Sequence, residues 1–368
     1  MALRALAACL LCASASAGAA IQAQDWGHTR AGQAVGRVTL ENLRGMRVSY
    51  IDYGATLTAI EVADRHGQRR NVVLSLPTLA DYEATGRRYG AIMGRYAGRI
   101  GNARFMQDGR PVELVPNAKG TALHGDPDGF DRRVWQRRDF ADADSLGSVY
   151  RLTSPDGDQH FPGRVEISVT YRLLRKHNEF RIEYAASSDA PTVINLTNHA
   201  YFNLAGAGSG GLATHRFTIH AARFAETDAK RVPTGVLLPV AGTPLDLRRA
   251  AAVMPRLRAS ALLGDPPGFD HSLLFSKKDG ALALVAEIVE TGSGRRLRVA
   301  STEPSVQFNS GNGFDGSEIG SEGVGYRRHD GFAFETQHLP DSPNHPNFPT
   351  TRLAPGQQFR STTSYRFD

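Results

Sequence analysis

Residues 165–174 read VEISVTYRLL, and residues 179–184, a few positions later, read EFRIEY. Apolar and polar side chains alternate along both runs, which is the pattern of a strand that buries one face. Residues 283–289 and 297–300 repeat this pattern. Many short runs of this kind, separated by turn residues, predict an all-β sandwich or barrel.

The rest of the chain supports one large β domain over residues 25–368. The chain has 368 residues with 38 glycines, and it shows no linker or solenoid repeat. Helices are expected only at residues 82–85 and 250–263. The net charge of +6 is mild for this length, and the basic residues form no run of five. Nucleic-acid binding is therefore not expected.

The N-terminus has the pattern of a secretory signal. A basic start is followed by apolar residues 5–12 and then by small residues, and Ala17-Gly18-Ala19 fits a cleavage site. We expect residues 1–23 to be removed and the protein to be exported to the periplasm. The apolar stretch is too short to span a bilayer, so no membrane anchor is expected. Both cysteines lie in this segment, so the mature chain would have no disulfide or reactive thiol.

Residues 331–337 read GFAFETQ and place a single acid between small residues. Phe332 and Phe334 point one way, toward a core, whereas Ala333, Glu335 and Gln337 point the other way. Burial there would raise the pKa of Glu335 above its ordinary value and make it a stronger base. The alternative is an exposed strand glutamate without a special function.

Two other runs present a polar face with few charges. The side chains on this face are Asn195, Thr197, His199, Tyr201, Asn203, Gln307 and Asn309. Amide, imidazole and phenol groups can replace the water that a neutral polyhydroxylated ligand loses on binding. The alternatives are a solvated outer sheet face and, for His199, a structural histidine.

Other motifs are rejected. Residues 206–211 match G-x-G-x-x-G, but the residues after them read as a strand and not as a helix that could bind a pyrophosphate. We expect a glycine-rich hairpin loop there. The twelve histidines show no H-E-x-x-H spacing, so no metal is expected, and no G-x-S-x-G motif is present.

At these residues the sequence closely resembles the aldose 1-epimerase (galactose mutarotase) family. The matching segments, in order, are residues 94–100 (GRYAGRI), 123–125 (LHG), 129–131 (GFD), Trp135, 154–157 (SPDG), 161–163 (FPG), 195–204 (NLTNHAYFNL), 233–235 (PTG), 268–271 (GFDH), 306–308 (VQF), 334–337 (FETQ) and 343–349 (PNHPNFP). They cover essentially the whole chain after the signal.

The resemblance implies a large antiparallel β-sandwich, the mutarotase supersandwich, and epimerisation of free aldohexoses or aldopentoses at C1 by ring opening. It implies that Glu335 is the general base and His199 the general acid. His124 matches a second active-site histidine that contacts the sugar. Arg99, Asp270 and Gln307 match sugar-binding positions. No cofactor is implied, and the protein is expected to be a monomer or homodimer.

Three departures from the family pattern affect the expected sugar preference. Gly98 stands where many members have Asn, which removes one sugar contact. Asp126 stands where Gly usually follows His-Gly, beside His124. Gln159 and His160 replace small turn residues. None of these changes falls on the acid/base pair.

Ring opening needs a proton acceptor for the C1 hydroxyl and a proton donor for the ring oxygen. At reference pKa values of about 4.3 and about 6.5, a Glu⁻/His⁺ pair is fully competent only between them, and at pH 7 only about a quarter of the histidine is protonated. We therefore expect either a raised pKa at His199, caused by a nearby carboxylate, or a mildly acidic activity optimum.

Three other functions stay open at this point. A glycoside hydrolase would need two carboxylates, for which Glu335 and Asp270 are the candidates. A sugar-binding module would bind without catalysis. An enzyme for phosphorylated hexoses would need extra arginines at the rim, and Arg95, Arg132 and Arg133 are the candidates.

Overall fold

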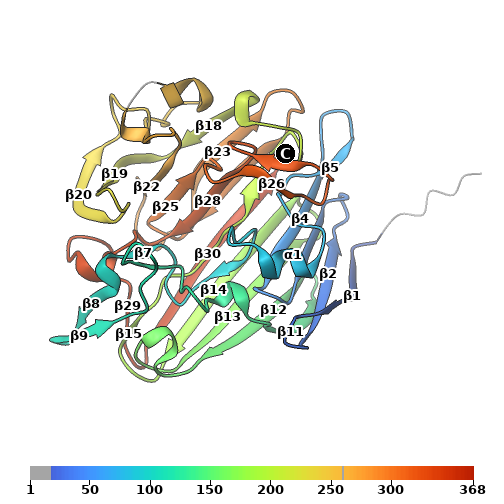
Figure 1. Ribbon diagram of the computed structural model, residues 1–368. Coiled ribbons are helices and arrows are strands. Elements are labelled where there is room, and N and C mark those ends of the chain that lie inside the picture. Colours follow the sequence, from blue (N-terminus) through green and yellow to red (C-terminus); the bar gives the residue numbers. More distant parts are fainter. Residues whose placement is uncertain (1–17, 259–260) are drawn as a thin grey trace, which may run out of the picture.

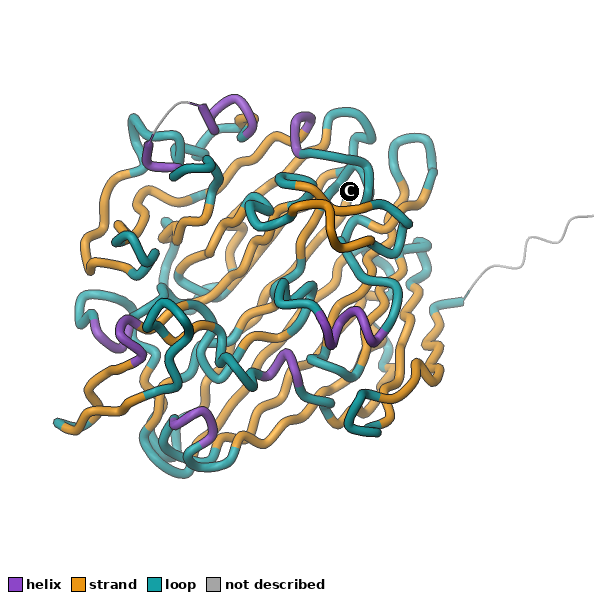
Figure 2. Tube along the Cα trace, in the orientation of Figure 1, coloured by secondary structure: helices purple, strands orange, loops and turns teal. Residues whose placement is uncertain are grey.

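The computed structural model describes residues 18–258 and 261–368. Strands dominate and helical turns are short (Figures 1 and 2). Among the described residues, no helix is long and apolar enough to cross a membrane. The first seventeen residues, where most of the predicted signal lies, are outside the described part. The strand β1 begins at Ala20, so the last four residues assigned to the signal, Ala20 to Ala23, belong to a sheet.

A nine-stranded antiparallel sheet forms the larger layer. Its strands, in spatial order, are β11 (Gln136–Ala141), β12 (Ser145–Ser154), β13 (Val165–Leu174), β14 (Glu179–Ser188), β30 (Gln358–Phe367), β24 (Arg296–Ser301), β23 (Ala283–Glu290), β18 (His215–Ile219) and β21 (Ala251–Ala252). The four strand runs identified from alternation all lie in this sheet. In β13 the side chains alternate between buried and more exposed along the whole strand, as predicted.

A six-stranded antiparallel sheet packs against the larger one and carries the site. It consists of β17 (Tyr201–Phe202), β28 (Phe332–Gln337), β25 (Ser305–Asn309), β22 (Asp270–Phe275), β19 (Ala221–Thr227) and β20 (Pro233–Pro239). Phe332 and Phe308 point into the core between the sheets, where both contact Phe217 of β18. The predicted all-β sandwich is confirmed.

The remaining elements complete the edges. A five-stranded sheet contains β1 (Ala20–His28), β2 (Ala34–Glu41), β3 (Arg47–Ile51), β4 (Thr56–Ala63) and β5 (Arg69–Asn71). Two-stranded pairs are β6 (Ile92–Met93) with β16 (Thr197–Asn198), β7 (Arg99–Ile100) with β10 (Ala122–Leu123), β8 (Arg104–Gln107) with β9 (Arg110–Glu113), β15 (Thr192–Val193) with β29 (Arg352–Leu353), and β26 (Asp315–Ile319) with β27 (Gly325–Arg327).

Helical structure is limited to one helix and seven short 3₁₀ turns in the described part. These are α1 (Leu79–Ala84), η1 (Gly101–Ala103), η2 (Phe130–Arg132), η3 (Asp158–His160), η4 (Leu212–Thr214), η5 (Met254–Arg258), η6 (Ala261–Leu263) and η7 (Ser342–Asn344). Thr78 and Asp81 form a capping box that starts α1. The α-helix expected over 250–263 is wrong, because the described part of that segment forms the short strand β21 and the 3₁₀ turns η5 and η6. The loop 206–211 is likewise not a hairpin, because it connects β17 and β18, which lie in different sheets.

Candidate active site

Three adjacent strands place three of the predicted site residues side by side. Glu335 lies in β28, Gln307 in β25 and Asp270 at the start of β22. In the strand register Gln307 is opposite Glu335, and Asp270 is opposite Asn309, two residues further along β25. Side chains two residues apart share a face of the sheet, so the three groups meet on the side away from the core.

Glu335 is buried on this face, with 2% of its surface exposed. Its neighbours Phe332 and Phe334 pack into the core, as the alternation predicted. Burial raises the pKa of Glu335 to about 8, and the charge of Asp270 acts in the same direction. The expectation of a buried carboxylate with a raised pKa is confirmed, and the alternative of an exposed strand glutamate is wrong.

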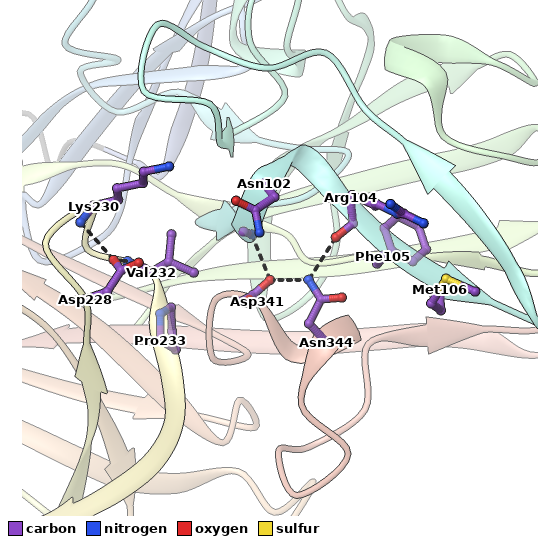
Figure 3. Close-up of a pocket in the computed structure, with 11 residues that line it drawn as sticks. Asn102, Arg104, Phe105, Met106, Asp228, Lys230, Val232, Pro233, Asp341 and Asn344 are labelled. Carbon is purple, nitrogen blue, oxygen red and sulfur yellow. Dashed lines mark hydrogen bonds between the residues drawn. The ribbon is translucent and has the colours of Figure 1, made fainter.

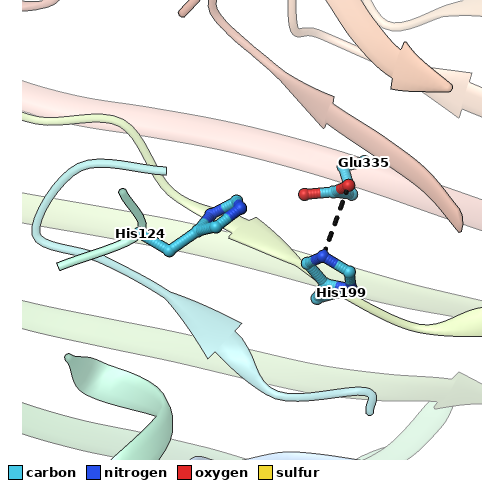
Figure 4. A group of neighbouring side chains, drawn as sticks. All are labelled: His124, His199 and Glu335. Carbon is cyan, nitrogen blue, oxygen red and sulfur yellow. Dashed lines mark ion pairs between the residues drawn. The ribbon is translucent and has the colours of Figure 1, made fainter. Parts of the chain in front are cut away.

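His199 lies against this carboxylate. Its Nε2 atom is 3.6 Å from Oε1 of Glu335 (Figure 4). The backbone between β16 and β17 is fixed by two hydrogen bonds, from His199 N–H to the Ala91 carbonyl (2.9 Å) and from Gly90 N–H to the His199 carbonyl (3.0 Å). The imidazole packs against the Tyr201 ring at a centroid distance of 5.0 Å. The side chain is therefore held in place against its partner.

His124 directly follows β10 and lies close to His199 and Glu335 (Figure 4). Its ring lies 5.5 Å from that of His199. The Gly98 N–H donates to Nδ1 of His124 at 3.1 Å, so the neutral ring carries its proton on Nε2. Burial, together with the Arg88 charge, holds the pKa of His124 well below its ordinary value. His124 is thus a neutral hydrogen-bond donor.

Asp270 is ionised in a network of hydrogen bonds. Burial alone would raise its pKa, but the charges of Arg99 and Arg231 and a hydrogen bond from Gln307 hold the pKa of Asp270 below its ordinary value. Gln307 Nε2 donates to Oδ1 at 2.7 Å, and Arg231 Nη1 pairs with Oδ2. Ser272 Oγ in turn donates to Oε1 of Gln307 at 2.5 Å. The predicted residues Arg99, Asp270 and Gln307 therefore lie at one site with Glu335.

The expected raised pKa at His199 is wrong. Burial, together with the positive charge of Arg88, lowers the pKa of His199 to about 4. The raised pKa belongs to Glu335 instead. Both shifts favour the uncharged forms, a carboxyl group and a neutral imidazole, so the resting pair shares one proton. Transfer of this proton to His199 produces the carboxylate and imidazolium without changing the net charge.

This arrangement predicts a broad pH profile. Below about pH 4 both groups are protonated and the base is lost, and above about pH 8 the shared proton leaves and the acid is lost. We expect kcat/KM to be level between these limits and to fall on both sides. Polarimetric rates from about pH 3 to pH 10 check this. An alkaline limb near the ordinary histidine value of about 6.5 would contradict the shared proton.

The predicted polar face over residues 195–203 is only partly correct. β16 and β17 are separate two-residue strands, and most amides between residues 195 and 203 bind backbone groups. Asn195 Nδ2 donates to the Ala97 and His338 carbonyls, and Asn203 Nδ2 donates to the Gly210 and Asp330 carbonyls. Thr197 Oγ1 donates to the Thr336 carbonyl. These three side chains stabilise the loops around the site, and only His199 and Tyr201 of that run face it.

Arg88 is a site residue that the sequence did not reveal. It pairs with Asp126 at 2.5 Å and lies 4.0 Å from Asp131. Its charge lowers the pKa of His124 and His199. The sequence feature that could have pointed to it is Asp126, an acid where the family usually has Gly. A partly buried acid at that position is expected to pair with a cationic side chain.

Two of the three arginines considered for phosphate binding, Arg95 and Arg133, have other roles. Arg95 is fully buried and donates to the carbonyls of Pro155, Pro162 and Gly163. Arg133 pairs with Asp158 at 2.7 Å. A phosphate at the rim would have to displace these partners, so neither residue offers a free guanidinium.

His124, His199 and Glu335 are also the residue types that bind divalent metals, and their ligand atoms lie within 4.8 Å of one another. A histidine that ligates a metal usually donates its other ring N–H to an oxygen. His124 does the opposite, because its Nδ1 accepts the Gly98 N–H and its pocket-facing nitrogen carries the proton. The donor set therefore fits an acid/base site and does not fit a metal centre.

A hollow of about 460 Å³ lies next to this site (Figure 3). It is lined by the segment from Gly101 to Met106, by Lys230 and Val232, and by Asp341. The Asp341 N–H donates to the carbonyl of Arg99 at 2.7 Å, which connects the hollow to the site strand β7. None of the six predicted site residues lines it.

Comparisons with known proteins agree with this geometry. The family model described as aldose 1-epimerase matches residues 36–366. The galactose mutarotase of Sus scrofa is 38% identical over 88% of this chain and 91% of its own. The aldose 1-epimerase of Escherichia coli (strain K12) is 37% identical over 91% and 96%. The crystal structure of a galactose 1-epimerase from Lactobacillus acidophilus NCFM superposes with a TM-score of 0.84 at 25% identity, covering 95% of this chain and 99% of that one. The chain belongs to the aldose 1-epimerase family.

Proposed function

We propose that this enzyme, an isomerase, interconverts the α and β anomers of free aldoses such as galactose and glucose, with Glu335 as proton acceptor and His199 as proton donor. The observation that carries this assignment is the 3.6 Å contact between Nε2 of His199 and Oε1 of Glu335 in one buried site. The family of this chain supports the same reaction.

The reaction consumes nothing. Glu335 accepts the proton of the C1 hydroxyl, the electrons of that O–H bond form the C1 carbonyl, and the C1–ring-oxygen bond breaks. His199 gives its proton to the departing ring oxygen. After rotation about C1–C2 the ring oxygen attacks the other face of the carbonyl, and both protons return. Each of the two groups is worth about 10²–10⁴-fold in rate.

The other residues supply binding. His124 offers an N–H donor, Arg99 a guanidinium, and Asp270 and Gln307 a carboxylate and an amide, which match the hydroxyls of an uncharged sugar. A hydrolase is disfavoured because the group that lies against Glu335 is an imidazole and not a second carboxylate. Asp270 already accepts hydrogen bonds on both oxygens.

Polarimetry of freshly dissolved α-D-galactose, α-D-glucose, xylose and arabinose tests the proposal. We expect the optical rotation to reach equilibrium faster than in buffer alone, and nitrophenyl glycosides to stay intact. A background rate together with measurable sugar binding would indicate a sugar-binding module. Release of nitrophenol would indicate a hydrolase.

We also propose export of the protein, with cleavage after Ala19. Residues 17–19 fit the cleavage pattern, and a cut there leaves β1 whole, because β1 begins at Ala20 and pairs with Glu41. Cleavage after Ala23 would remove four strand residues. Sequencing the N-terminus of the protein from a periplasmic extract should give Ala20, and a chain that still begins at Met1 would contradict export.

A further inference from the structure

We propose that Arg231 is a further substrate-binding residue, whose guanidinium donates to the oxygen of the same sugar hydroxyl whose proton Asp270 accepts. This rests on the proposed function. Through that shared hydroxyl, Arg231 determines which aldoses the enzyme prefers.

Arg231 reaches the site from the turn between β19 and β20. Asp228 organises the turn, because its carboxylate accepts the N–H groups of Lys230 (2.8 Å) and Val232 (2.9 Å), and its carbonyl accepts the N–H of Arg231 (2.9 Å). Arg231 has a φ of 62°, in the left-handed region that residues other than glycine rarely adopt. Such a conformation persists where surrounding contacts enforce it, and it often marks a functional position.

The guanidinium of Arg231 forms an ion pair with Asp270. Arg231 Nη1 pairs with Oδ2 of Asp270, while Oδ1 accepts the Gln307 amide at 2.7 Å. Gln307 is directly opposite Glu335 in the strand register. Arg231 therefore contacts Asp270, Asp270 contacts Gln307, and Gln307 lies beside Glu335, the proposed proton acceptor, on the neighbouring strand.

The ion pair faces open space. Arg231 and Asp270 both line a cavity of about 550 Å³, together with the apolar side chains of Phe224, Leu238 and Leu263. The Arg231 side chain is 43% exposed and that of Asp270 is 13% exposed. A partly exposed ion pair contributes little to stability, so stability does not explain the contact.

The pair still has hydrogen-bonding capacity after its own contact is made. A guanidinium has five N–H donors and a carboxylate about four acceptor positions. Among the described residues, Asp270 is the one acceptor of the Arg231 side chain. The wall of the cavity therefore carries a hydrogen-bond donor, Arg231, next to an acceptor, Asp270. A sugar hydroxyl is both acceptor and donor, so one hydroxyl can satisfy both groups.

Lys230 provides a matched control from the same turn. Lys230 lines the neighbouring hollow with Asp341 and Asn344 (Figure 3). Arg231 lines the other cavity, with Asp270. Lys230→Leu removes one positive charge from the same turn without touching Asp270. We expect kcat and KM of this variant to equal those of the wild type.

The test measures kcat and KM by polarimetry for galactose and for its 2-, 3-, 4- and 6-deoxy derivatives. The proteins are the wild type, Arg231→Leu, Arg231→Lys, Asp270→Asn and Lys230→Leu. We expect Arg231→Leu to lower kcat/KM for galactose by about 10- to 100-fold, mostly through KM, which is the size of a lost hydrogen bond to a charged group. Arg231→Lys should recover part of the loss.

The deoxy series identifies the contact. For one deoxy sugar the loss caused by Arg231→Leu should disappear, and the same sugar should be insensitive to Asp270→Asn. An equal loss for every sugar, or no loss for any, would overturn the proposal. A failure of this proposal can be distinguished from a failure of the proposed function. If the wild-type protein did not accelerate mutarotation, the proposed function would be wrong, and this would be seen before any variant is compared. Because the turn is exposed, we expect the variants to unfold at the same temperature as the wild type, which is the check that they are folded.

Discussion

Glu335→Gln should lower kcat for galactose by about 10²–10⁴-fold, with a much smaller change in KM. The amide has the size of the carboxyl group and keeps its place on β28, but it cannot accept the proton of the C1 hydroxyl. Glu335 is buried, so bulk water is poorly placed to act as a substitute base. Stopped-flow or conventional polarimetry over a range of galactose concentrations separates kcat from KM.

Glu287→Gln is the matched control for this variant. Glu287 also lies on a strand, β23, but it pairs with Arg296 and Arg298 on the surface. Its amide variant should keep wild-type activity. If folded Glu335→Gln retained more than about a tenth of the wild-type kcat, Glu335 would not be the proton acceptor.

His199→Asn should lower kcat by a similar factor, about 10²–10⁴-fold. Asparagine can occupy the space between Glu335 and Tyr201, but its amide N–H is too weak an acid to transfer a proton to the ring oxygen. The variant also removes the site that receives the shared proton from Glu335. The ring-opened product would then leave as a costly alkoxide. His177→Asn, on an exposed turn, is the control and should be fully active.

The double variant tests whether the two groups act together. Residues that act as one unit lose activity non-additively, so Glu335→Gln combined with His199→Asn should be about as slow as the slower single variant. A double variant slower by the product of both factors would mean that the groups act in separate steps.

The strands were predictable because alternation is local. VEISVTYRLL is β13 over its whole length, and the two phenylalanines of GFAFETQ face the core while Glu335 faces the site. The side on which a strand residue lies depends only on its parity along that strand. The fold class and the position of the carboxylate could therefore be inferred from short segments.

The protonation states could not be predicted, because they depend on residues far apart in the chain. The pKa of His199 is lowered by burial and by the charge of Arg88, and Arg88 pairs with Asp126. The roles of Asn195 and Asn203 were missed for the same reason, since their acceptors lie in distant segments. Alternation shows which face a side chain occupies, but it does not show what else reaches that face.

Exchange NMR in D₂O, on galactose at anomeric equilibrium and on methyl α-D-galactoside, tests most directly whether ring opening at the hemiacetal is the reaction. The enzyme should produce exchange cross-peaks between the α and β anomeric protons of galactose, and the C2 proton should be retained. The methyl glycoside should stay unchanged, because it lacks the hydroxyl proton that the carboxylate must remove. Deuterium incorporation at C2, or release of methanol from the glycoside, would contradict it.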